Sequence, residues 1–253
     1  MDLFSLTGKV ALVTGGNGGI GFGMAEGLSE AGAAVLVVGR NAAKNKAAVE
    51  ALSSKGGQAK AIEADVARDE GGAAAVAAAI DLFGRLDILV NNAGTNIRKQ
   101  PQEYDIGEWR ALIDANLTSA FLCAKAAYPH MRSGGGKIIN IGSMTSLFGA
   151  PFAGPYGAAK GGVVQLTKAL ASAWAKDGIQ VNAVLPGWID TELTRGARRD
   201  VPTLHDRVLA RTPAGRWGVP ADLAGIAVFL ASKASDFITG TAIPVDGGYA
   251  AQG

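Results

Sequence analysis

Tyr156 and Lys160 form a Tyr-x-x-x-Lys pattern, so on a helix their phenol and ammonium groups lie on one face. A phenol has a pKa of about 10 and is a poor base near neutral pH, but a nearby ammonium stabilises the phenolate and lowers that pKa. Ser143 lies thirteen residues before Tyr156, directly after an apolar run. Such a set could move a proton to or from a substrate oxygen, although a Tyr–Lys pair alone also arises by chance on helix surfaces.

A glycine cluster, Thr-Gly-Gly-Asn-Gly-Gly-Ile-Gly, occupies residues 14–21 after the first apolar run. It fits two spacings, Gly16-x-Gly18-x-x-Gly21 and Gly15-x-x-x-Gly19-x-Gly21. Such glycines permit a tight turn and let backbone N–H groups reach a pyrophosphate at a helix N-terminus. The alternative is a turn that only packs helix on strand, but its position after the first strand favours a dinucleotide site. The expected contacts are Gly15, Asn17, Gly18, Gly19, Ile20 and Gly21.

The second apolar run ends Val-Gly-Arg40-Asn41, without the acidic residue that binds the ribose 2′-hydroxyl of NAD about 20 residues after the glycines. Arg40 can instead form charge-assisted bonds to a 2′-phosphate. The alternative is an ordinary exposed arginine at a strand end. The missing carboxylate favours NADP(H) as cofactor, with NAD(H) still possible.

Short apolar runs alternate with longer Ala-rich segments along the chain. The predicted strands are 9–14, 34–38, 59–62, 87–91, 137–141, 179–184 and 241–245. The predicted helices are 20–31, 42–54, 70–83, 106–132 and 156–175. Strands that are apolar throughout indicate a parallel sheet covered on both faces. We therefore predict one doubly wound α/β domain over residues 1–253.

The least regular part of the sequence is about 188–218, which contains Trp188 and a basic cluster formed by Arg195, Arg198 and Arg199. We expect it to be an excursion over the active site, because loops on rigid scaffolds carry specificity. In the stripe expected along helix 106–132, Phe121 lies with Leu117 and Tyr128.

Composition argues against several classes of function. The formal net charge is +2 with no basic stripe, so neither nucleic-acid nor membrane-surface binding is expected. Cys123, the one cysteine, is expected to be buried and inert, and His130 and His205 lack the spacing of metal ligands. No apolar run of about 18 residues or secretory leader is evident, so we expect a cytoplasmic protein without a metal.

Taken in order, these motifs resemble the short-chain dehydrogenase/reductase family from about Leu6 to Tyr249. The matching positions are Thr14-Gly15-x-x-x-Gly19-Ile20-Gly21, Asp65-Val66, Asn91-Asn92-Ala93-Gly94, Asn116, Ser143, Tyr156-x-x-x-Lys160 and Pro186-Gly187. The resemblance implies a seven-stranded Rossmann-type sheet, a catalytic Ser–Tyr–Lys–Asn set and a homotetramer or homodimer.

The resemblance also implies a role for each catalytic position. Tyr156 would protonate the carbonyl oxygen during reduction, and Ser143 would hydrogen-bond that oxygen. Lys160 would bind the nicotinamide ribose and depress the Tyr156 pKa, and Asn116 would hold a water linking Lys160 to solvent.

Further cofactor contacts follow from the same resemblance. Asp65 and Val66 would contact the adenine, and the ribose would be lined by Asn92, Ala93 and Gly94. The nicotinamide carboxamide would be seated by Pro186, Gly187, Ile189 and Thr191.

Within the family, the chain is similar to gluconate 5-dehydrogenases and 2-deoxygluconate 3-dehydrogenases in segments 96–98, 211–218 and 231–237. Arg98 could hold a sugar-acid carboxylate or be a solvated loop arginine, and Ser143 and Trp188 are further candidate substrate contacts. The expected reaction is ketone reduction or secondary-alcohol oxidation on a sugar acid or polyol. The alternatives are a 3-ketoacyl-thioester reductase or a broad carbonyl reductase. A non-enzymatic NADP sensor tends to lose Ser, Tyr or Lys, and all three remain.

Overall fold

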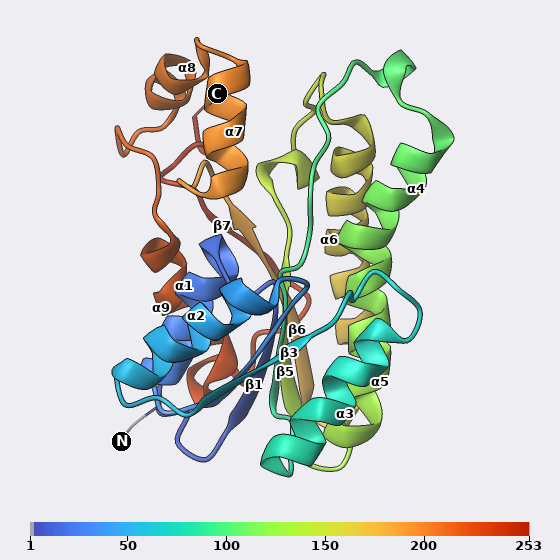
Figure 1. Cartoon of the computed structure of the whole chain (residues 1–253), viewed down its shortest axis with the longest axis vertical. Coiled ribbons are helices and arrows are strands. Elements are labelled where there is room, and N and C mark those ends of the chain that lie inside the picture. Colours follow the sequence, from blue (N-terminus) through green and yellow to red (C-terminus); the bar gives the residue numbers. More distant parts are fainter. Residues whose placement is uncertain (1–2, 253) are drawn as a thin grey trace.

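Seven apolar segments form one parallel sheet in the computed structural model, which describes residues 3–252 (Figure 1). The strands are β1 Val10–Thr14, β2 Ala34–Gly39, β3 Ala59–Glu63, β4 Ile88–Asn91, β5 Gly136–Ile141, β6 Ile179–Pro186 and β7 Ala242–Val245. Their order is β3-β2-β1-β4-β5-β6-β7, and every neighbouring pair is parallel. The ends of the expected domain, residues 1–2 and 253, lie outside the described residues.

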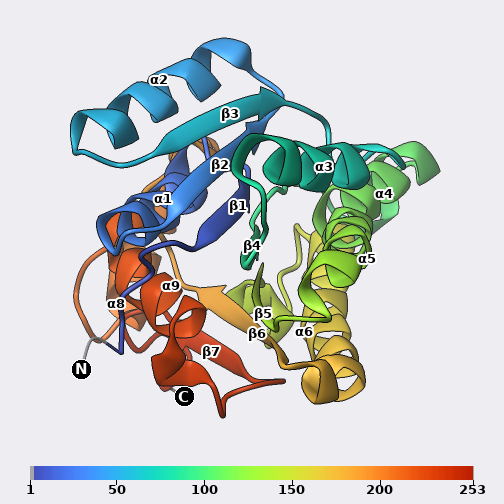
Figure 2. The same cartoon turned by 90° about the horizontal axis from the view of Figure 1, so that it is seen from below.

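Helices cover both faces of this sheet, as the view from below shows (Figure 2). One face carries α1 Gly19–Glu30, α2 Ala42–Ser54 and α9 Ala224–Ala231. The other carries α3 Gly71–Phe83, α5 Ser119–Met131 and α6 Gly154–Trp174. A short α4, Ile106–Ile113, continues through a π-helical turn at Asp114–Thr118 into α5. Shorter 3-10 turns lie at Pro101–Glu103, Met144–Ser146, Ala175–Asp177, Pro220–Leu223 and Lys233–Ser235.

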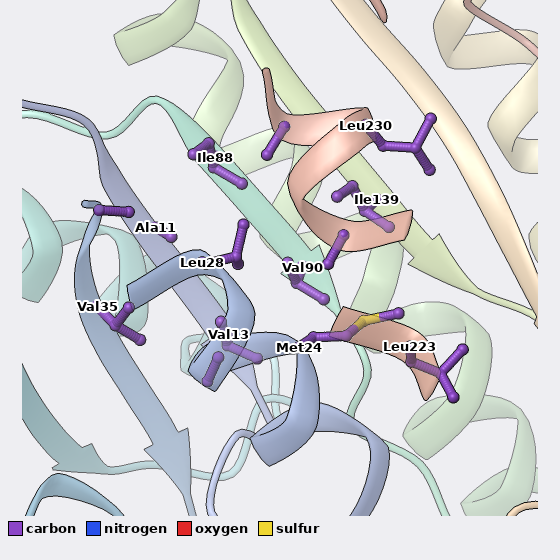
Figure 3. Close-up of a cluster of buried hydrophobic side chains, with 14 of the residues drawn as sticks. Ala11, Val13, Met24, Leu28, Val35, Ile88, Val90, Ile139, Leu223 and Leu230 are labelled. Atoms are coloured by element: carbon purple, nitrogen blue, oxygen red, sulfur yellow. The ribbon is translucent and has the colours of Figure 1, made fainter. Parts of the chain in front are cut away.

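The alternation of side chains along each strand divides the core into two layers. Ala11 and Val13 of β1 pack with α1 and α9, whereas Leu12 between them packs toward α3 and α5. Figure 3 shows the first layer, in which Met24 and Leu28 of α1 and Leu230 of α9 belong to one cluster on this face of the sheet. Burial on both faces explains why the central strands β1, β2 and β4 are apolar at nearly every position rather than at alternate ones.

The sequence-based prediction of the sheet is confirmed, and the helical prediction needs three corrections. The segment expected to be irregular, 188–218, contains two helices, α7 Glu192–Asp200 and α8 Leu204–Arg211. The expected helix 106–132 is interrupted by the π turn. Phe121, expected on its buried stripe, is 44% exposed, whereas Cys123 and Ala124 of the same helix are fully buried.

The structure also bears on Cys123, on groups of metal-ligating side chains and on membrane-spanning helices. Cys123 is buried as expected, and burial raises its pKa to about 12. Within residues 3–252, no cluster of three potential metal-ligating side chains occurs. No helix in that range has the length and apolar character that a membrane crossing requires.

Candidate active site

Every predicted site residue lies at or beyond the carboxyl ends of the strands or on the helices that follow them. In a parallel sheet these ends meet along one edge, which is where open α/β sheets bind ligands. The edge is at the top in Figure 1, where β1 leads into α1 and where α7 and α8 stand above β6 and β7.

The glycine loop leaves the N-terminus of α1 open. Gly18 precedes the helix without any side-chain cap, and the first turn contains no acidic residue. A Cβ placed on Gly18 would meet no atom within 4 Å, whereas Gly15 and Gly19 have positive φ angles of 61° and 52°. Unpaired backbone N–H groups and the positive helix end therefore face free space, which suits an anionic group such as a pyrophosphate.

Asn92 holds this loop in place. Its Nδ2 donates to the carbonyl oxygens of Thr14 (3.0 Å) and Gly15 (3.1 Å). The Thr14 hydroxyl in turn accepts from the backbone N–H groups of Asn92 and Ala93. A Cβ on Gly21 would lie 2.4 Å from both Asn92 Nδ2 and Gly15 O, so only glycine fits there. The predicted cofactor residues Asn92 and Ala93 thus have a structural role in shaping the loop.

Asn17 and Arg40, two predicted cofactor residues, differ in how their side chains are held: that of Asn17 is hydrogen-bonded within the protein, whereas that of Arg40 is largely exposed. Asn17 Nδ2 donates to Asn45 Oδ1 (2.7 Å), so its amide ties the loop to α2 instead of projecting freely. Arg40 has 73% of its side chain exposed and lies 3.9 Å from an oxygen of Asp65. The next residue after Arg40 caps α2, so the guanidinium stands beside a helix N-terminus. Val66, adjacent to Asp65, is buried.

Ser143 and Tyr156 come together at the start of α6. Ser143 caps the turn Met144–Ser146, and its Oγ accepts from Thr145 N (3.1 Å). Burial raises the pKa of Tyr156, while hydrogen bonding with Ser143 and the charge of Arg98 act in the opposite direction. Tyr156 is therefore a neutral phenol at physiological pH, with a hydroxyl and a cation nearby.

Lys160 is buried one turn along α6, and its Nζ donates to Ile141 O (2.7 Å). Burial lowers the Lys160 pKa to about 8, and Nζ lies 5.7 Å from the centre of the Tyr156 ring. The nearby charge that acts to lower the Tyr156 pKa is that of Arg98, and Lys160 Nζ is directed toward the backbone at the end of β5. The lowering of the Tyr156 pKa by Lys160 stays a prediction.

Asn116 sits in the π turn that joins α4 to α5, a distortion that frequently marks functional sites. Its Nδ2 donates to the carbonyl oxygens of Thr95 (2.8 Å) and Leu112 (2.9 Å), and its Oδ1 accepts from Thr95 N. A Cβ on Gly94 would lie 2.5 Å from Asn116 Oδ1 and 3.6 Å from Lys160 Nζ. Gly94 therefore brings Asn116 and Lys160 close together.

The end of β6 brings the remaining predicted residues to the same edge. After Pro186, Gly187 N donates to Val245 O (3.0 Å), and Ile189 is buried beneath the segment. Thr191 caps α7, and its Cγ2 would be 3.3 Å from a Cβ on Gly19, so α7 begins against the glycine loop. Trp188 packs edge-on against Trp217, with ring centres 5.6 Å apart.

Two sets of contacts made by the region after β6 were not predicted. Arg198 lies over the Trp217 ring at 4.4 Å and pairs with Asp190, so part of the basic cluster serves packing within the excursion. Lys44 of α2 pairs with Glu192 of α7 (2.6 Å), which joins these two helices. No sequence signal could reveal this pair, because 148 residues separate its members.

Known proteins are similar to this chain along its whole length. A family model described as enoyl-(acyl carrier protein) reductase matches residues 15–250. The 2-dehydro-3-deoxy-D-gluconate 5-dehydrogenase of Escherichia coli is 42% identical over 100% of this chain and 99% of its own length. The 5-keto-D-gluconate 5-reductase of the same organism is 42% identical, covering 98% and 97%. A solved gluconate 5-dehydrogenase from Burkholderia cenocepacia, in complex with NADP and tartrate, has a TM-score of 0.94 at 42% identity, covering 100% and 99%.

Proposed function

The chain belongs to the short-chain dehydrogenase/reductase family, and from this premise we propose that it is an NADP(H)-dependent oxidoreductase of sugar acids. It would interconvert a ketone and a secondary alcohol. The observation that carries the proposal is the half-buried Arg98 beside Tyr156, close enough for its charge to lower the Tyr156 pKa. Among residues 3–252, no carboxylate forms an ion pair with Arg98, so the guanidinium is available to an acidic substrate.

The residues present fit a dinucleotide. Gly18 and Gly19 offer backbone N–H groups at the open end of α1, and Gly15, Ile20 and Gly21 complete the turn. The adenine would lie by Asp65 and Val66, and the ribose by Asn92, Ala93 and Gly94. The carboxamide would be seated by Pro186, Gly187, Ile189 and Thr191. When bound, the nicotinamide supplies or accepts the hydride.

Arg40 supports NADP(H) over NAD(H). Its guanidinium is exposed next to the N-terminus of α2, where a 2′-phosphate would gain a charge-assisted hydrogen bond. An oxygen of Asp65 lies 3.9 Å from the Arg40 guanidinium and pairs with it. The NADP named with the B. cenocepacia relative supports the same preference.

The catalytic role of Tyr156 follows from its protonation state, and the other residues of the site act around it. Tyr156 is protonated at neutral pH because burial raises its pKa, so it can donate a proton to the carbonyl oxygen of the substrate. Ser143 hydrogen-bonds that oxygen and orients it toward Tyr156. Lys160 binds the ribose hydroxyls through Nζ, and Asn116 holds a water between Lys160 and solvent. Trp188 contacts the substrate from the side of β6.

The carboxylate role of Arg98 predicts a selective defect. Arg98→Ala should raise KM for an acidic ketone such as 5-keto-D-gluconate by about tenfold or more, because one charge-assisted hydrogen bond contributes about 1.5–3 kcal/mol. KM for an uncharged polyol or ketone should change less than twofold. Steady-state kinetics on both substrates measures this, and equal changes for the two would remove the carboxylate role.

A 3-ketoacyl-thioester reductase and a broad carbonyl reductase would use the same Ser–Tyr–Lys set. The sugar-acid enzymes named above favour the sugar-acid reading, and a free Arg98 has no use in binding a neutral thioester. A non-enzymatic NADP sensor is disfavoured because the acid/base set is intact.

We also propose a homotetramer, or a homodimer, in the cytoplasm, with residues 1–253 as one catalytic domain. Large apolar side chains exposed on the single chain, among them Trp109, Phe121 and Phe237, support association with further copies. Size-exclusion chromatography with light scattering measures the oligomeric state.

A further inference from the structure

Two buried polar atoms in segments next to the candidate active site, one two residues after Ser143 and the other two residues before Arg98, have no hydrogen-bond partner. Within residues 3–252, four buried side-chain atoms lack one: Asn91 Oδ1, Asn96 Oδ1, Thr145 Oγ1 and Trp217 Nε1. An unpaired buried polar atom destabilises a protein, so each exception calls for an explanation. Asn91 is fixed in the core through its Nδ2, and Trp217 packs among aromatic rings. The unpaired atoms of Asn96 and Thr145 are left without such an explanation.

Thr145 lies between the two groups that act on the substrate oxygen. Its backbone N–H donates to Ser143 Oγ (3.1 Å), which fixes it two residues beyond that serine. Its Cβ would be 4.0 Å from a Cβ on Gly157, the residue that follows Tyr156. The Thr145 side chain is therefore packed against the first turn of α6, and its hydroxyl has no protein acceptor there.

Asn96 lies in the loop after β4, between Thr95 and Arg98, which are both linked to the candidate site. Thr95 on one side is bonded to Asn116 through both its N–H and its carbonyl. Arg98, two residues beyond Asn96, acts on Tyr156. Ile97 O lies 2.6 Å from the Tyr104 hydroxyl, which also lies 3.2 Å from Phe152 O, so this segment runs along the loop that follows Ser143.

We propose that Asn96 and Thr145 determine substrate specificity by binding hydroxyl groups of the substrate on carbons near the reacting carbonyl. This rests on the proposed sugar-acid function and deepens it. The Asn96 carbonyl oxygen accepts a hydrogen bond from a hydroxyl group, and the Thr145 hydroxyl donates or accepts one. The ligand class is a carbon chain with a carboxylate at one end and hydroxyls beside the ketone. Such a site rejects analogues without hydroxyls, because its own polar groups then stay unpaired.

The same geometry predicts opposite effects on stability and on binding. Thr145→Val removes an unpaired hydroxyl while keeping the shape of the side chain, so Tm should rise by about 2–4 °C. Thr167→Val is the matched control. The Thr167 hydroxyl donates to Val163 O (2.8 Å) and accepts from Asn140 Nδ2 (2.9 Å), so losing it should lower Tm by a similar amount.

The decisive test compares two ketones of equal length, 5-keto-D-gluconate and 5-oxohexanoate, which has the same carboxylate and ketone positions but no hydroxyls. Thr145→Val and Asn96→Ala should each lower kcat/KM for 5-keto-D-gluconate at least tenfold and change that for 5-oxohexanoate less than twofold. Thr145→Ser, which keeps the hydroxyl, should resemble the wild type. If 5-oxohexanoate turns over too slowly, its inhibition constant against 5-keto-D-gluconate gives the same comparison.

The outcomes separate this inference from the proposed function. No wild-type activity on any sugar acid would overturn the proposed function itself. Wild-type activity with equal losses on both ketones in the variants would overturn only the assignment of Asn96 and Thr145. A tenfold weaker NADPH dissociation constant in Thr145→Val, measured by fluorescence titration, would also overturn it, because the hydroxyl would then serve the cofactor.

Discussion

Burial shifts the pKa values of Tyr156 and Lys160, both on α6, in opposite directions. It raises the pKa of Tyr156, which keeps the phenol neutral, and it lowers the pKa of Lys160 to about 8, which eases loss of the ammonium charge. The Tyr-x-x-x-Lys pattern predicted the shared helix face, but it could not show where Lys160 points. Only the fold reveals that Nζ meets Ile141 O and that Arg98 supplies the charge at Tyr156.

The acid/base role of Tyr156 has a direct consequence. Tyr156→Phe should lower kcat for ketone reduction by roughly 10²–10⁴-fold, since a positioned proton donor contributes about that factor. The NADPH dissociation constant should stay within about twofold, because the glycine loop and Arg40 are untouched. Stopped-flow kinetics and fluorescence titration measure the two quantities. Retained turnover in this variant would contradict the role.

The buried Lys160 makes stability depend on pH. Its pKa is about 8 in the folded chain and 10.5 in the unfolded chain, so between these values the unfolded chain binds more protons. The free energy of unfolding therefore gains a contribution that rises with pH from about 8 to 10.5. In Lys160→Met this contribution should vanish. Denaturant unfolding at pH 7, 9 and 10 checks it, and parallel pH profiles for both proteins would refute the expectation.

At the scale of elements, the sequence predicts the strands well, because β-branched runs bounded by glycine leave few alternatives. It predicts the connections after β6 less well. The α9 helix is apolar on all sides and packs both beside α1 and on the sheet, so it has no helical periodicity to detect. The helices α7 and α8 are only nine and eight residues long and contain few apolar residues, and the π turn at Asn116 has no sequence signature.

The contact between α1 and the turn before α9 is close enough to admit only glycine. A Cβ on Gly23 would lie 2.3 Å from Pro220 O, a backbone atom that cannot easily move. Gly23→Ala should therefore lower the free energy of unfolding by about 1–3 kcal/mol through overpacking. Gly225→Ala on α9 is the control, since a Cβ there meets no atom within 4 Å and should be neutral or slightly stabilising. Equal effects in thermal unfolding would disprove this packing.

At the scale of the whole molecule, the parallel sheet explains why residues from 15 to 191 converge. All strands end at one edge, so the loops after β1, β4, β5 and β6 face one another without any contact visible in sequence. The family motifs therefore predict a site at this edge of the sheet. They could not predict the unpaired Asn96 and Thr145 atoms, because whether a polar atom finds a partner depends on packing among segments far apart in the chain.

The central claim, NADP(H)-dependent chemistry on a sugar acid, is tested most directly by the wild-type protein on a panel of ketones. The panel holds 5-keto-D-gluconate, an uncharged polyol ketone and a 3-ketoacyl thioester, each assayed with NADPH and with NADH at 340 nm. We predict the highest kcat/KM for 5-keto-D-gluconate with NADPH, at least tenfold above the other pairs. A higher kcat/KM for the thioester, or for NADH with every substrate, would contradict the account.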